Sequence, residues 1–524
     1  MTQGLYQLLP RSSADLEQPP ISTPNCPRRS ASYLRTCVHL PCKLLRRLRS
    51  RRVLYLLVPL LMLVAYTALL NPSYTSPPPF TQPKDESLYI AGNNVDEALI
   101  RGAWGDAIVE LARTYPPAQV YVSVYGSPTS AMEHLDQRLE FYGVPRTIVS
   151  QELSPINMTE LSHVIAPNGE RMVKRIEYLA EVRNRALRPL KKLPKRYHKV
   201  LFLNDVVFSP QDALRLLYST TAAPVSNATE AEAREMRTSY RAACALDFIN
   251  PFKFYDTYAT RDTGGYYPGV PIFPFFSGAG SAVSRRDVVA NKEAVRVKSC
   301  WGGMVAFDGR FLQSLPPPIA MAPKGPDESQ RDTANQTREQ YSAWLSEMYG
   351  PDAAESWEPI RFRSEPQRLW DASECCLIHA DIARPAPDGQ DWEDEDVGIY
   401  MNPYVRVAYE SLTYDFLWLS KRLERLLIIP QQLLNWCAEM PRGNAHRQIV
   451  SNQVYPTRVW QSDDVGASEG WEGGKGHYEN STRVAGKGGF CGVRQLLVWR
   501  EMVEEGEKNW VKLPIPPAEE GMDS

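Results

Sequence analysis

An uncharged run of 18 residues, Val53 to Leu70, divides the chain into two unequal parts. As a helix it would be about 27 Å long, close to the thickness of the hydrocarbon core of a bilayer. A cleaved signal peptide would have a shorter apolar region and a small-residue cleavage site, whereas "NPSYTSPPPF" follows here. The sequence therefore predicts an uncleaved signal anchor that crosses a membrane once.

Charge on the two sides of this run predicts its orientation. Residues 1–52 contain ten Lys and Arg against Asp15 and Glu17, a net charge of +8, which leaves −10 for the rest of the chain. The positive-inside rule places this tail in the cytosol and the remainder in the lumen of the secretory pathway. We therefore expect a single-pass type II protein of the Golgi membrane. The acidic remainder lacks the basic surface that nucleic-acid binding requires.

Two further patterns agree with a luminal location. Four N-x-S/T sequons follow the apolar run, at Asn157, Asn227, Asn335 and Asn480, where glycosylation is possible. Six of the nine cysteines also follow it: Cys244, Cys300, Cys375, Cys376, Cys437 and Cys491. An even number of cysteines in an oxidising compartment predicts disulfides, although sequence alone does not fix the pairing. We expect Cys437 to pair with Cys491, and Cys300 with Cys375 or Cys376.

Composition divides the chain into five parts. They are a basic and mostly disordered cytosolic tail (1–52), the anchor (53–70), a Pro-rich stem (71–88), a luminal catalytic domain (89–430) and a C-terminal extension (431–524). We expect this extension to pack on the catalytic domain and to contain a mobile Gly-rich loop at residues 461–489.

Strand and helix patterns alternate through the luminal part. A strand pattern at 118–127 precedes a helix pattern at 131–143, and a helix pattern at 175–190 precedes an apolar strand at 200–203 and a helix from about Pro210. This alternation predicts an α/β domain with a mixed, mostly parallel central sheet. In such sheets, ligands bind beyond the carboxyl ends of the strands.

Asn204 and Asp205 stand at such an end, directly after the apolar strand in "KVLFLNDVVF". Asp205 could cap the helix that starts near Pro210, or its carboxylate could hold Mn²⁺ or Mg²⁺. An enzyme that uses a nucleotide sugar needs such an ion because its leaving group is a diphosphate. The usual pattern for that task is Asp-x-Asp, and here Asn204 stands beside a single acid.

Two later segments carry acids among aromatic residues. "CALDFINPFKFYDTYATRD" contains Asp247, Tyr258, Arg261 and Asp262, a mixture that suits sugar recognition and that an aromatic core with surface acids would also explain. In "KSCWGGMVAFDG", Trp301 precedes two glycines, which suggests an exposed ring, and Asp308 follows a short apolar strand.

"SECCLIHADI" places Glu374 and His379 on either side of a predicted strand. His379 could be a further metal ligand or a buried structural histidine. The chain has no G-x-S-x-G elbow, no H-E-x-x-H zinc helix, no kinase signature and no G-x-G-x-x-G after a strand.

Taken in order, these segments resemble the fungal family of cryptococcal mannosyltransferases and capsule-associated proteins. The resemblance covers roughly residues 90–430 and also includes "VYVSVYGSPTS" and "RIEYLAEVRNRALRPL". It implies a GT-A-like fold and metal-stimulated α-1,3-mannosyl transfer from GDP-mannose to a mannose-containing glycan, with retention of configuration.

The resemblance also implies roles for single residues. Asp205 would bind the metal and the diphosphate with Asn204 beside it, Asp247, Asp308 and Glu374 would hold donor and acceptor hydroxyls, and Arg261 would assist the leaving group. Asp262, Tyr258 and Trp301 would contact donor or acceptor. Gly302 stands where the family pattern leads us to expect Asn, which puts an acceptor contact at that position in doubt. The alternatives are a non-catalytic luminal protein of capsule or wall glycan assembly, and a transferase that uses another nucleotide sugar such as UDP-xylose.

Overall fold

The structure is a computed structural model. It describes residues 51–166, 170–220, 240–314, 357–384, 396–441, 446–449, 451–462, 476–500 and 509–516, together with a few isolated positions between these ranges.

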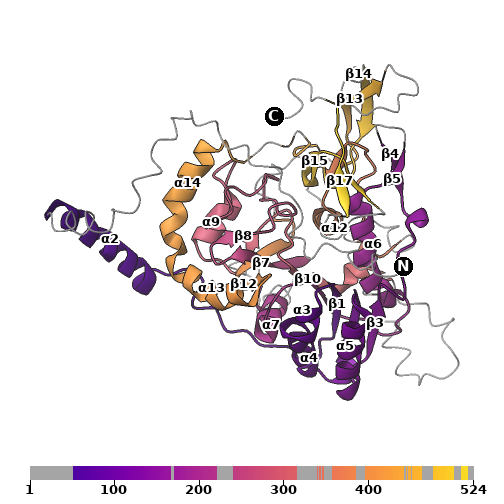
Figure 1. Cartoon of the computed structure of the whole chain (residues 1–524), viewed down its shortest axis with the longest axis horizontal. Coiled ribbons are helices and arrows are strands. Elements are labelled where there is room, and N and C mark those ends of the chain that lie inside the picture. Colours follow the sequence, from indigo (N-terminus) through magenta and orange to yellow (C-terminus); the bar gives the residue numbers. More distant parts are fainter. Residues whose placement is uncertain are drawn as a thin grey trace, which may run out of the picture.

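A nine-stranded sheet forms the centre of the molecule, in the order β3-β2-β1-β6-β10-β7-β12-β9, with β8 paired to β7 (Figure 1). Its strands are β1 (Leu88–Asn94), β2 (Val120–Gly126), β3 (Arg146–Ser150), β6 (Lys199–Leu203), β7 (Ala242–Asn250), β8 (Lys253–Phe254), β9 (Val295–Arg296), β10 (Met304–Asp308) and β12 (Ile399–Ala408). Strands β3, β2, β1 and β6 are parallel, β10 is antiparallel to both of its neighbours, and β7 and β12 are parallel to each other. The predicted mixed, mostly parallel sheet is confirmed.

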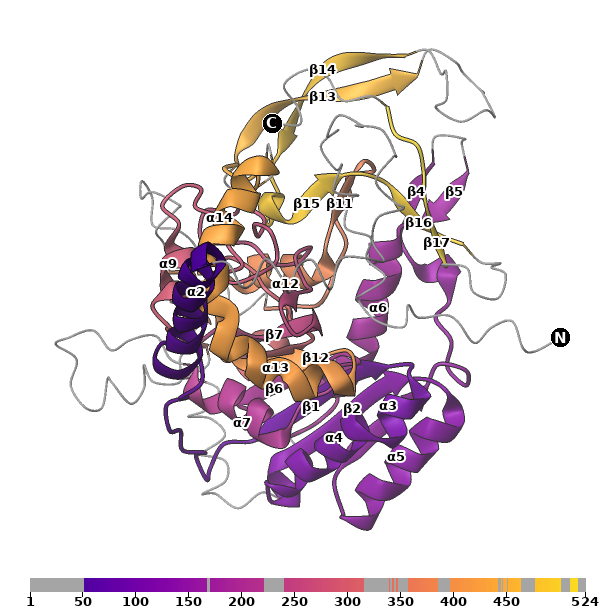
Figure 2. The ribbon, with the colours of Figure 1, turned by 60° about the vertical axis from the view of Figure 1, so that its left-hand side comes forward.

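Helices cover both faces of this sheet. On one side lie α3 (Glu97–Arg101), α4 (Ala103–Arg113), α5 (Thr129–Phe141) and α7 (Pro210–Ser219); on the other lie α6 (Arg175–Leu187) and α12 (Glu374–Ile382) (Figure 2). Strand β6 lies between the two layers. Its Leu201 and Leu203 pack with α4 and α7, while Val200 and Phe202 pack in the cluster that includes α12. Burial on both faces explains why this strand is an unbroken apolar run.

The segment "SECCLIHADI" forms helix α12 and not the strand that we predicted. Eight of its nine residues are buried, so its hydrophobic side chains show no helical periodicity. A short apolar run of this kind does not distinguish a buried helix from a buried strand.

The segment before the sheet is packed against the domain. Helix α2 (Arg51–Leu70) leads into Ser73 and Tyr74, both of which are buried. The Tyr74 hydroxyl donates to the Val288 carbonyl at 2.9 Å, and its ring meets Tyr404 edge-on. The first residues of the expected stem are therefore part of the domain surface. Among the residues that the structure describes, no helix is both long and apolar enough to cross a membrane.

The remaining elements lie outside the central sheet. The helices are α9 (Val283–Val289), α13 (Ser411–Leu423) and α14 (Ile428–Cys437). Four small sheets pair β4 (His163–Ile165) with β5 (Arg171–Val173), β11 (Trp370–Ala372) with β15 (Gly492–Arg494), β13 (Val454–Ser462) with β14 (Gly476–Val484), and β16 (Leu497–Trp499) with β17 (Trp510–Lys512). The pairing of β11 with β15 joins the C-terminal extension to the domain. Strand β14 lies inside the Gly-rich segment 461–489, and the mobility expected of this segment stays a prediction.

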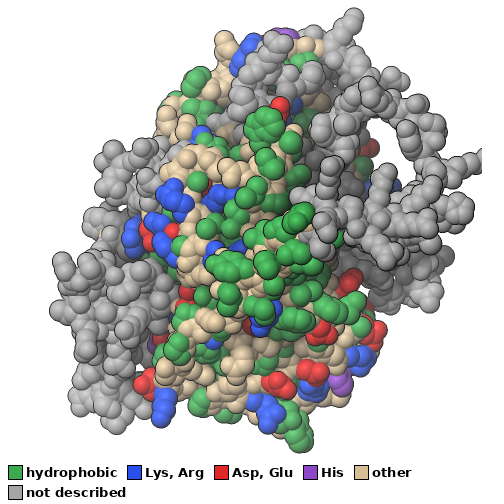
Figure 3. Space-filling model, turned by 90° about the vertical axis from the view of Figure 1, so that its left-hand side faces the viewer, with side chains coloured by type: hydrophobic (Ala, Val, Ile, Leu, Met, Phe, Trp, Pro, Cys, Tyr) green, Lys and Arg blue, Asp and Glu red, His purple; other side chains and the backbone are tan. Residues whose placement is uncertain are grey.

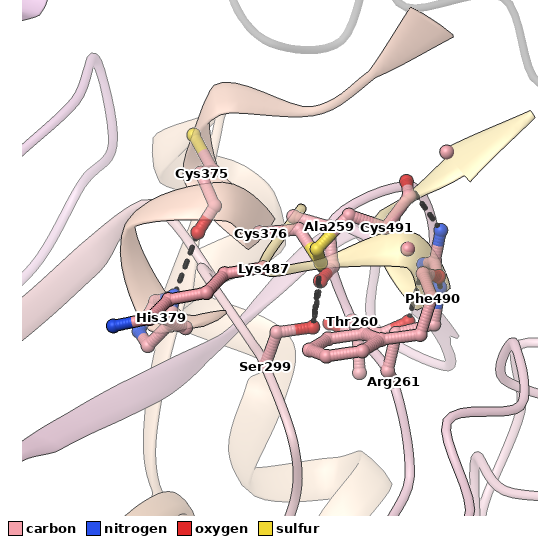
Figure 4. Close-up of a disulfide and its surroundings, with 12 residues drawn as sticks. Ala259, Thr260, Arg261, Ser299, Cys375, Cys376, His379, Lys487, Phe490 and Cys491 are labelled. Atoms are coloured by element: carbon pink, nitrogen blue, oxygen red, sulfur yellow. Dashed lines mark hydrogen bonds between the residues drawn. A yellow bond between two sulfur atoms is a disulfide. The ribbon is translucent and has the colours of Figure 1, made fainter. Parts of the chain in front are cut away.

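The two disulfides differ from the expected pairs. Cys244 is bonded to Cys300, and Cys376 to Cys491. Cys437 is exposed at the end of α14, and Cys375 is buried and free. In α12, Cys376 points toward the C-terminal segment while its neighbour Cys375 points elsewhere (Figure 4). Sequence proximity suggested the pairing of Cys437 with Cys491, but the fold brings Cys491 to α12.

Thiol mapping provides a direct check of this connectivity. We expect non-reducing peptide maps to contain the Cys244–Cys300 and Cys376–Cys491 linkages. A thiol reagent added to the folded protein should modify Cys437 rapidly, because its side chain is exposed, and Cys375 only after unfolding. Recovery of a Cys437–Cys491 peptide would contradict the structure.

Candidate functional site

The carboxyl ends of β1, β6 and β7 meet along one edge of the central sheet. Asn94 ends β1, Asn204 and Asp205 follow β6, and Asp247 lies in β7. Antiparallel β10 begins at this same edge, directly after Trp301–Gly303, because Met304 pairs with Leu203 at the end of β6. Polar side chains from distant segments therefore converge where α/β proteins bind ligands.

The turn after β6 is held by its backbone. The Asn204 amide donates to the Gly303 carbonyl at 2.8 Å, and the Trp104 indole donates to the Asn204 carbonyl at 2.7 Å. Asn204 Oδ1 is buried and accepts no hydrogen bond. A buried acceptor without a partner is costly, so this atom is suited to a ligand.

Asp205 does not cap the following helix. Ser209 is the N-cap of α7 and forms a reciprocal capping box with Asp212. The carboxylate of Asp205 is nevertheless 6% exposed, and it is one of the groups that raise the pKa of the Arg183 guanidinium. The cap that the sequence left open is therefore excluded, and ligand binding by Asp205 stays a prediction.

A buried ion pair lies beside Asp205. Arg183 of α6 and Glu374 at the start of α12 approach to 2.9 Å between Nη1 and Oε1, and both side chains are almost fully enclosed. Burial alone would lower the pKa of this guanidinium, yet Cys375, Glu374 and Asp205 together raise it. The site therefore contains one fixed cation between two carboxylates.

Asp247 and Asp256 form a second acidic pair. Asp247 Oδ1 accepts from the Asp256 amide at 3.0 Å, and Oδ2 accepts from the Tyr409 hydroxyl at 2.7 Å. Burial, with a further contribution from Asp256, raises the pKa of Asp247 to about 7. The pKa of Asp256 is also raised, mainly by burial. Near neutral pH such a pair can hold a proton.

The raised pKa of Asp247 predicts how the free energy of unfolding depends on pH. Because the native pKa of Asp247 is raised, its contribution to the free energy of unfolding is full below the ordinary carboxyl pKa and is lost as the pH rises through about 7. Asp247→Asn keeps the shape of the side chain and removes the titration. We expect wild type to lose on the order of 1 kcal/mol or more relative to this variant between about pH 5 and about pH 8. Urea unfolding of both proteins at each pH measures this; equal slopes would contradict the assignment.

Gly302 brings the start of β10 close to β7, and Gly303 lies against Val206. Gly302 has a φ of +59°, and a Cβ on it would lie 2.0 Å from the Ala245 carbonyl oxygen. The structure therefore requires glycine where we expected Asn. Trp301 beside it is 1% exposed and packs on Phe202 and Phe362. The expectation of an exposed ring that stacks on a sugar is wrong, because this ring lies beneath the site.

Arg261 is enclosed by carbonyl groups and not by a ligand site (Figure 4). It donates to the carbonyls of Phe490, Tyr258, Thr260 and Cys491 at 2.7–3.0 Å. The bonds to Phe490 and Cys491 join the C-terminal extension to the domain, and those to Tyr258 and Thr260 hold the local turn. The structure contradicts the predicted contact with a leaving group.

Two neighbours of Arg261 also have structural partners. The Tyr258 hydroxyl donates to Asp371. Asp262 Oδ1 accepts from the Tyr266 amide at 2.8 Å, and burial raises the pKa of this carboxyl to about 7. Neither side chain belongs to the cluster around Asp205, so their predicted roles in donor or acceptor binding are not supported by the geometry.

Asp308 lies at the opposite edge of the sheet. Antiparallel pairing places it beside Lys199 at the start of β6, while Asp205 follows the end of that strand. Its carboxylate accepts from the Arg310 backbone amide and forms an ion pair with the same residue. The prediction of a catalytic Asp308 is therefore wrong.

His379 is a buried structural histidine. Its Nδ1 lies 2.6 Å from the Cys375 carbonyl, and burial lowers the pKa of the ring to about 4 (Figure 4). Cys244 and Cys300 lie near enough to His379 to suggest a metal cluster. Their sulfurs form a disulfide, however, and are not available as ligands. The prediction of a metal ligand at His379 is wrong.

Of the four sequons, two lie in the described residues. Asn157 and Asn480 are exposed, the latter on β14. Asn227 and Asn335 lie outside the described residues. All four remain predictions.

The structure thus brings together Asn204, Asp205, Asp247 and Glu374 from the predicted set. It adds Arg183 and Asp256 to them. Arg183 stands in "EVRNRALRPL", where it reads as one of several arginines on a surface helix, and nothing in that pattern marks it as buried. Asp256 lies among the aromatic residues of 244–262, so this segment did carry a signal for it.

Buried acids and a buried arginine thus lie at the edge of the sheet where α/β proteins bind ligands. The sequence identifies the family of the protein. The family model described as "Cryptococcal mannosyltransferase 1" matches residues 87–381, more than half of the chain. The chain belongs to this glycosyltransferase family, which confirms the resemblance. No curated protein sequence matches significantly.

Two solved structures resemble this chain weakly. The mannosyltransferase PcManGT from Pyrobaculum calidifontis, in complex with GDP-Man and Mn²⁺, is 12% identical; the match covers 72% of this chain and 71% of that one, with a TM-score of 0.28. Glucosyl-3-phosphoglycerate synthase from Mycobacterium tuberculosis, in complex with Mn²⁺, UDP and phosphoglyceric acid, is 11% identical over 76% and 87%, with a TM-score of 0.26. At these identities and TM-scores, neither structure supports an argument about this chain.

Proposed function

We propose that the protein transfers mannose from GDP-mannose to a mannose-containing glycan, forming an α-1,3 linkage with retention, and that it requires Mn²⁺ or Mg²⁺. Family membership supports the reaction class. The observation that carries the proposal is the group formed by Asp205, Arg183 and Glu374, held at the sheet edge where α/β proteins bind ligands.

Asp205 and Asn204 would hold the divalent cation. Their oxygen atoms suit a hard ion, and the unpartnered Oδ1 of Asn204 is the observation that favours a ligand there. When bound, the ion would neutralise the diphosphate of the donor. The backbone of Asn204 also holds the turn, through its bonds to Gly303 and Trp104.

The remaining residues would act on the donor and acceptor. Arg183 supplies a positive charge close to Asp205, and Glu374 fixes the plane of its guanidinium. The Asp247–Asp256 pair retains a proton near neutral pH and can both accept and donate hydrogen bonds to sugar hydroxyls. The same arrangement would serve a front-face or a covalent retaining mechanism.

The location that we propose is the Golgi membrane, with a type II orientation and the domain in the lumen. The uncharged run 53–70 after a basic tail supports this orientation, as do sequons that all follow the run.

The test is a donor panel with the purified full chain. We expect mannose transfer from GDP-mannose to a mannose disaccharide in the presence of Mn²⁺, abolished by EDTA, with UDP-xylose and UDP-glucose inactive. Linkage analysis of the product would identify the α-1,3 bond. Transfer from UDP-xylose would show that the donor is UDP-xylose and not GDP-mannose. If no nucleotide sugar is transferred or hydrolysed, the result would favour a non-catalytic protein of glycan assembly.

A further inference from the structure

Helix α14 exposes an apolar face to its surroundings. Its ten residues, "IIPQQLLNWC", include no charged side chain. Ile429, Leu433, Leu434 and Trp436 are 70%, 58%, 47% and 79% exposed. Single exposed apolar residues are ordinary, but four large ones on one short helix require an explanation.

The opposite face of the same helix is polar and buried. Gln431 is fully buried and donates to the carbonyls of Val270 and Phe276. Asn435 is 5% exposed and accepts from the Val270 amide at 2.6 Å. A water-facing helix buries its apolar stripe and exposes its polar one. Apart from Gln432, which is exposed, helix α14 has the reverse arrangement, so its outer face is suited to a medium less polar than water.

This face lies on the side of the molecule from which α2 projects. Helix α2 is attached there through α13: the Ser73 amide donates to the Lys421 carbonyl at 2.8 Å, and Arg422 donates to the Ala68 carbonyl at 3.3 Å. Figure 1 shows α2 extending outward from this side, with α14 beside its base. Seen from that direction in Figure 3, a broad run of hydrophobic side chains crosses the surface.

We propose that α14 lies in the interface of a lipid bilayer, with Ile429, Leu433 and Trp436 inserted among the lipids. A bilayer explains three observations together: the absence of charge on α14, the buried polar face that needs no water, and the neighbouring α2, which is uncharged and apolar from Val53 to Leu70. Tryptophan is enriched at this depth of a membrane. The proposal concerns this surface and is independent of the reaction at the sheet edge.

The position of Cys437 allows a direct measurement. It is exposed at the end of α14, and Cys26, Cys37 and Cys42 of the tail can be replaced by serine. We would label Cys437 of the full chain with an environment-sensitive fluorophore and reconstitute the protein into phosphatidylcholine vesicles. We expect strong quenching by lipids that carry a nitroxide on the acyl chain and weak quenching by aqueous iodide.

Two variants make the measurement specific. The first moves the thiol to Phe141→Cys in a Cys437→Ser background, at an 82% exposed position at the end of α5, where iodide should quench and lipid nitroxide should not. The second is Ile429→Gln with Leu433→Gln, which should remove most of the lipid quenching and leave the unfolding midpoint unchanged, because both side chains are exposed.

Three results would overturn the proposal. They are iodide quenching at Cys437 as strong as at position 141, failure of the chain to float with vesicles, and protection from both quenchers together with crosslinked dimers. The last result would show that a second copy of the chain covers α14.

Discussion

Asp205→Ala is expected to lower kcat/KM for mannose transfer by about a thousandfold, the effect typical of removing one charge-stabilising group from an active site. The carboxylate follows β6 at the sheet edge, is 6% exposed and influences the charge of Arg183. No second acid completes an Asp-x-Asp pattern, because the positions two residues before and after Asp205 are Leu203 and Val207. The variant should also lose the stabilisation by Mn²⁺ that thermal unfolding measures in wild type.

The matched control for this variant is Asp308→Asn. It changes an aspartate at the other end of neighbouring strand β10, at the opposite edge of the sheet. We expect its kcat/KM to stay within about twofold of wild type, since the change lies away from the site and Asn can still accept from the Arg310 amide. Comparable losses in the two variants, or Mn²⁺ stabilisation that survives in Asp205→Ala, would refute the assignment of the metal site.

The sequence predicted helices and strands correctly where the hydrophobic pattern of a segment reflects which of its faces are buried. The apolar run 199–203 forms the central strand β6, and the helix expected at 175–190 is α6 followed by a short 3-10 turn. Helix α12 was not predictable in this way, because a segment buried on all sides loses the periodicity that identifies a helix. The disulfides were not predictable either, since pairing depends on which Cα atoms the fold brings together.

The site was predictable only in part, for a reason of topology. A polar residue after an apolar strand marks the ligand edge when that strand is parallel to its neighbours. This rule found Asp205. It failed at Asp308, because β10 runs antiparallel and its carboxyl end lies at the other edge. The direction of a strand relative to its neighbours depends on which strands pair. The sequence of one strand does not contain this information. Arg183 was missed for a related reason: only the packing of α6 against α12 buries it.

A second buried ion pair connects the segment after α2 to the sheet. Arg406 of β12 forms two hydrogen bonds with Glu424, of 2.9 and 2.7 Å, and both side chains are at most 3% exposed. Ser73, which follows α2, donates to the same carboxylate. The pair therefore holds β12, the end of α13 and the segment after α2 in one arrangement.

Arg406→Met is expected to lower the free energy of unfolding by about 3–5 kcal/mol, because it leaves the carboxylate of Glu424 buried without its cation. The double variant Arg406→Met with Glu424→Leu should recover most of this loss, since replacing both charges with hydrophobic residues removes the uncompensated charge. Arg101→Ala, which breaks an exposed pair with Glu97 on α3, should cost less than about 0.5 kcal/mol. Chemical unfolding of the four proteins, followed by tryptophan fluorescence, measures these differences. A double variant no more stable than Arg406→Met would show that the loss of stability comes from packing and not from the unpaired, buried charge of Glu424.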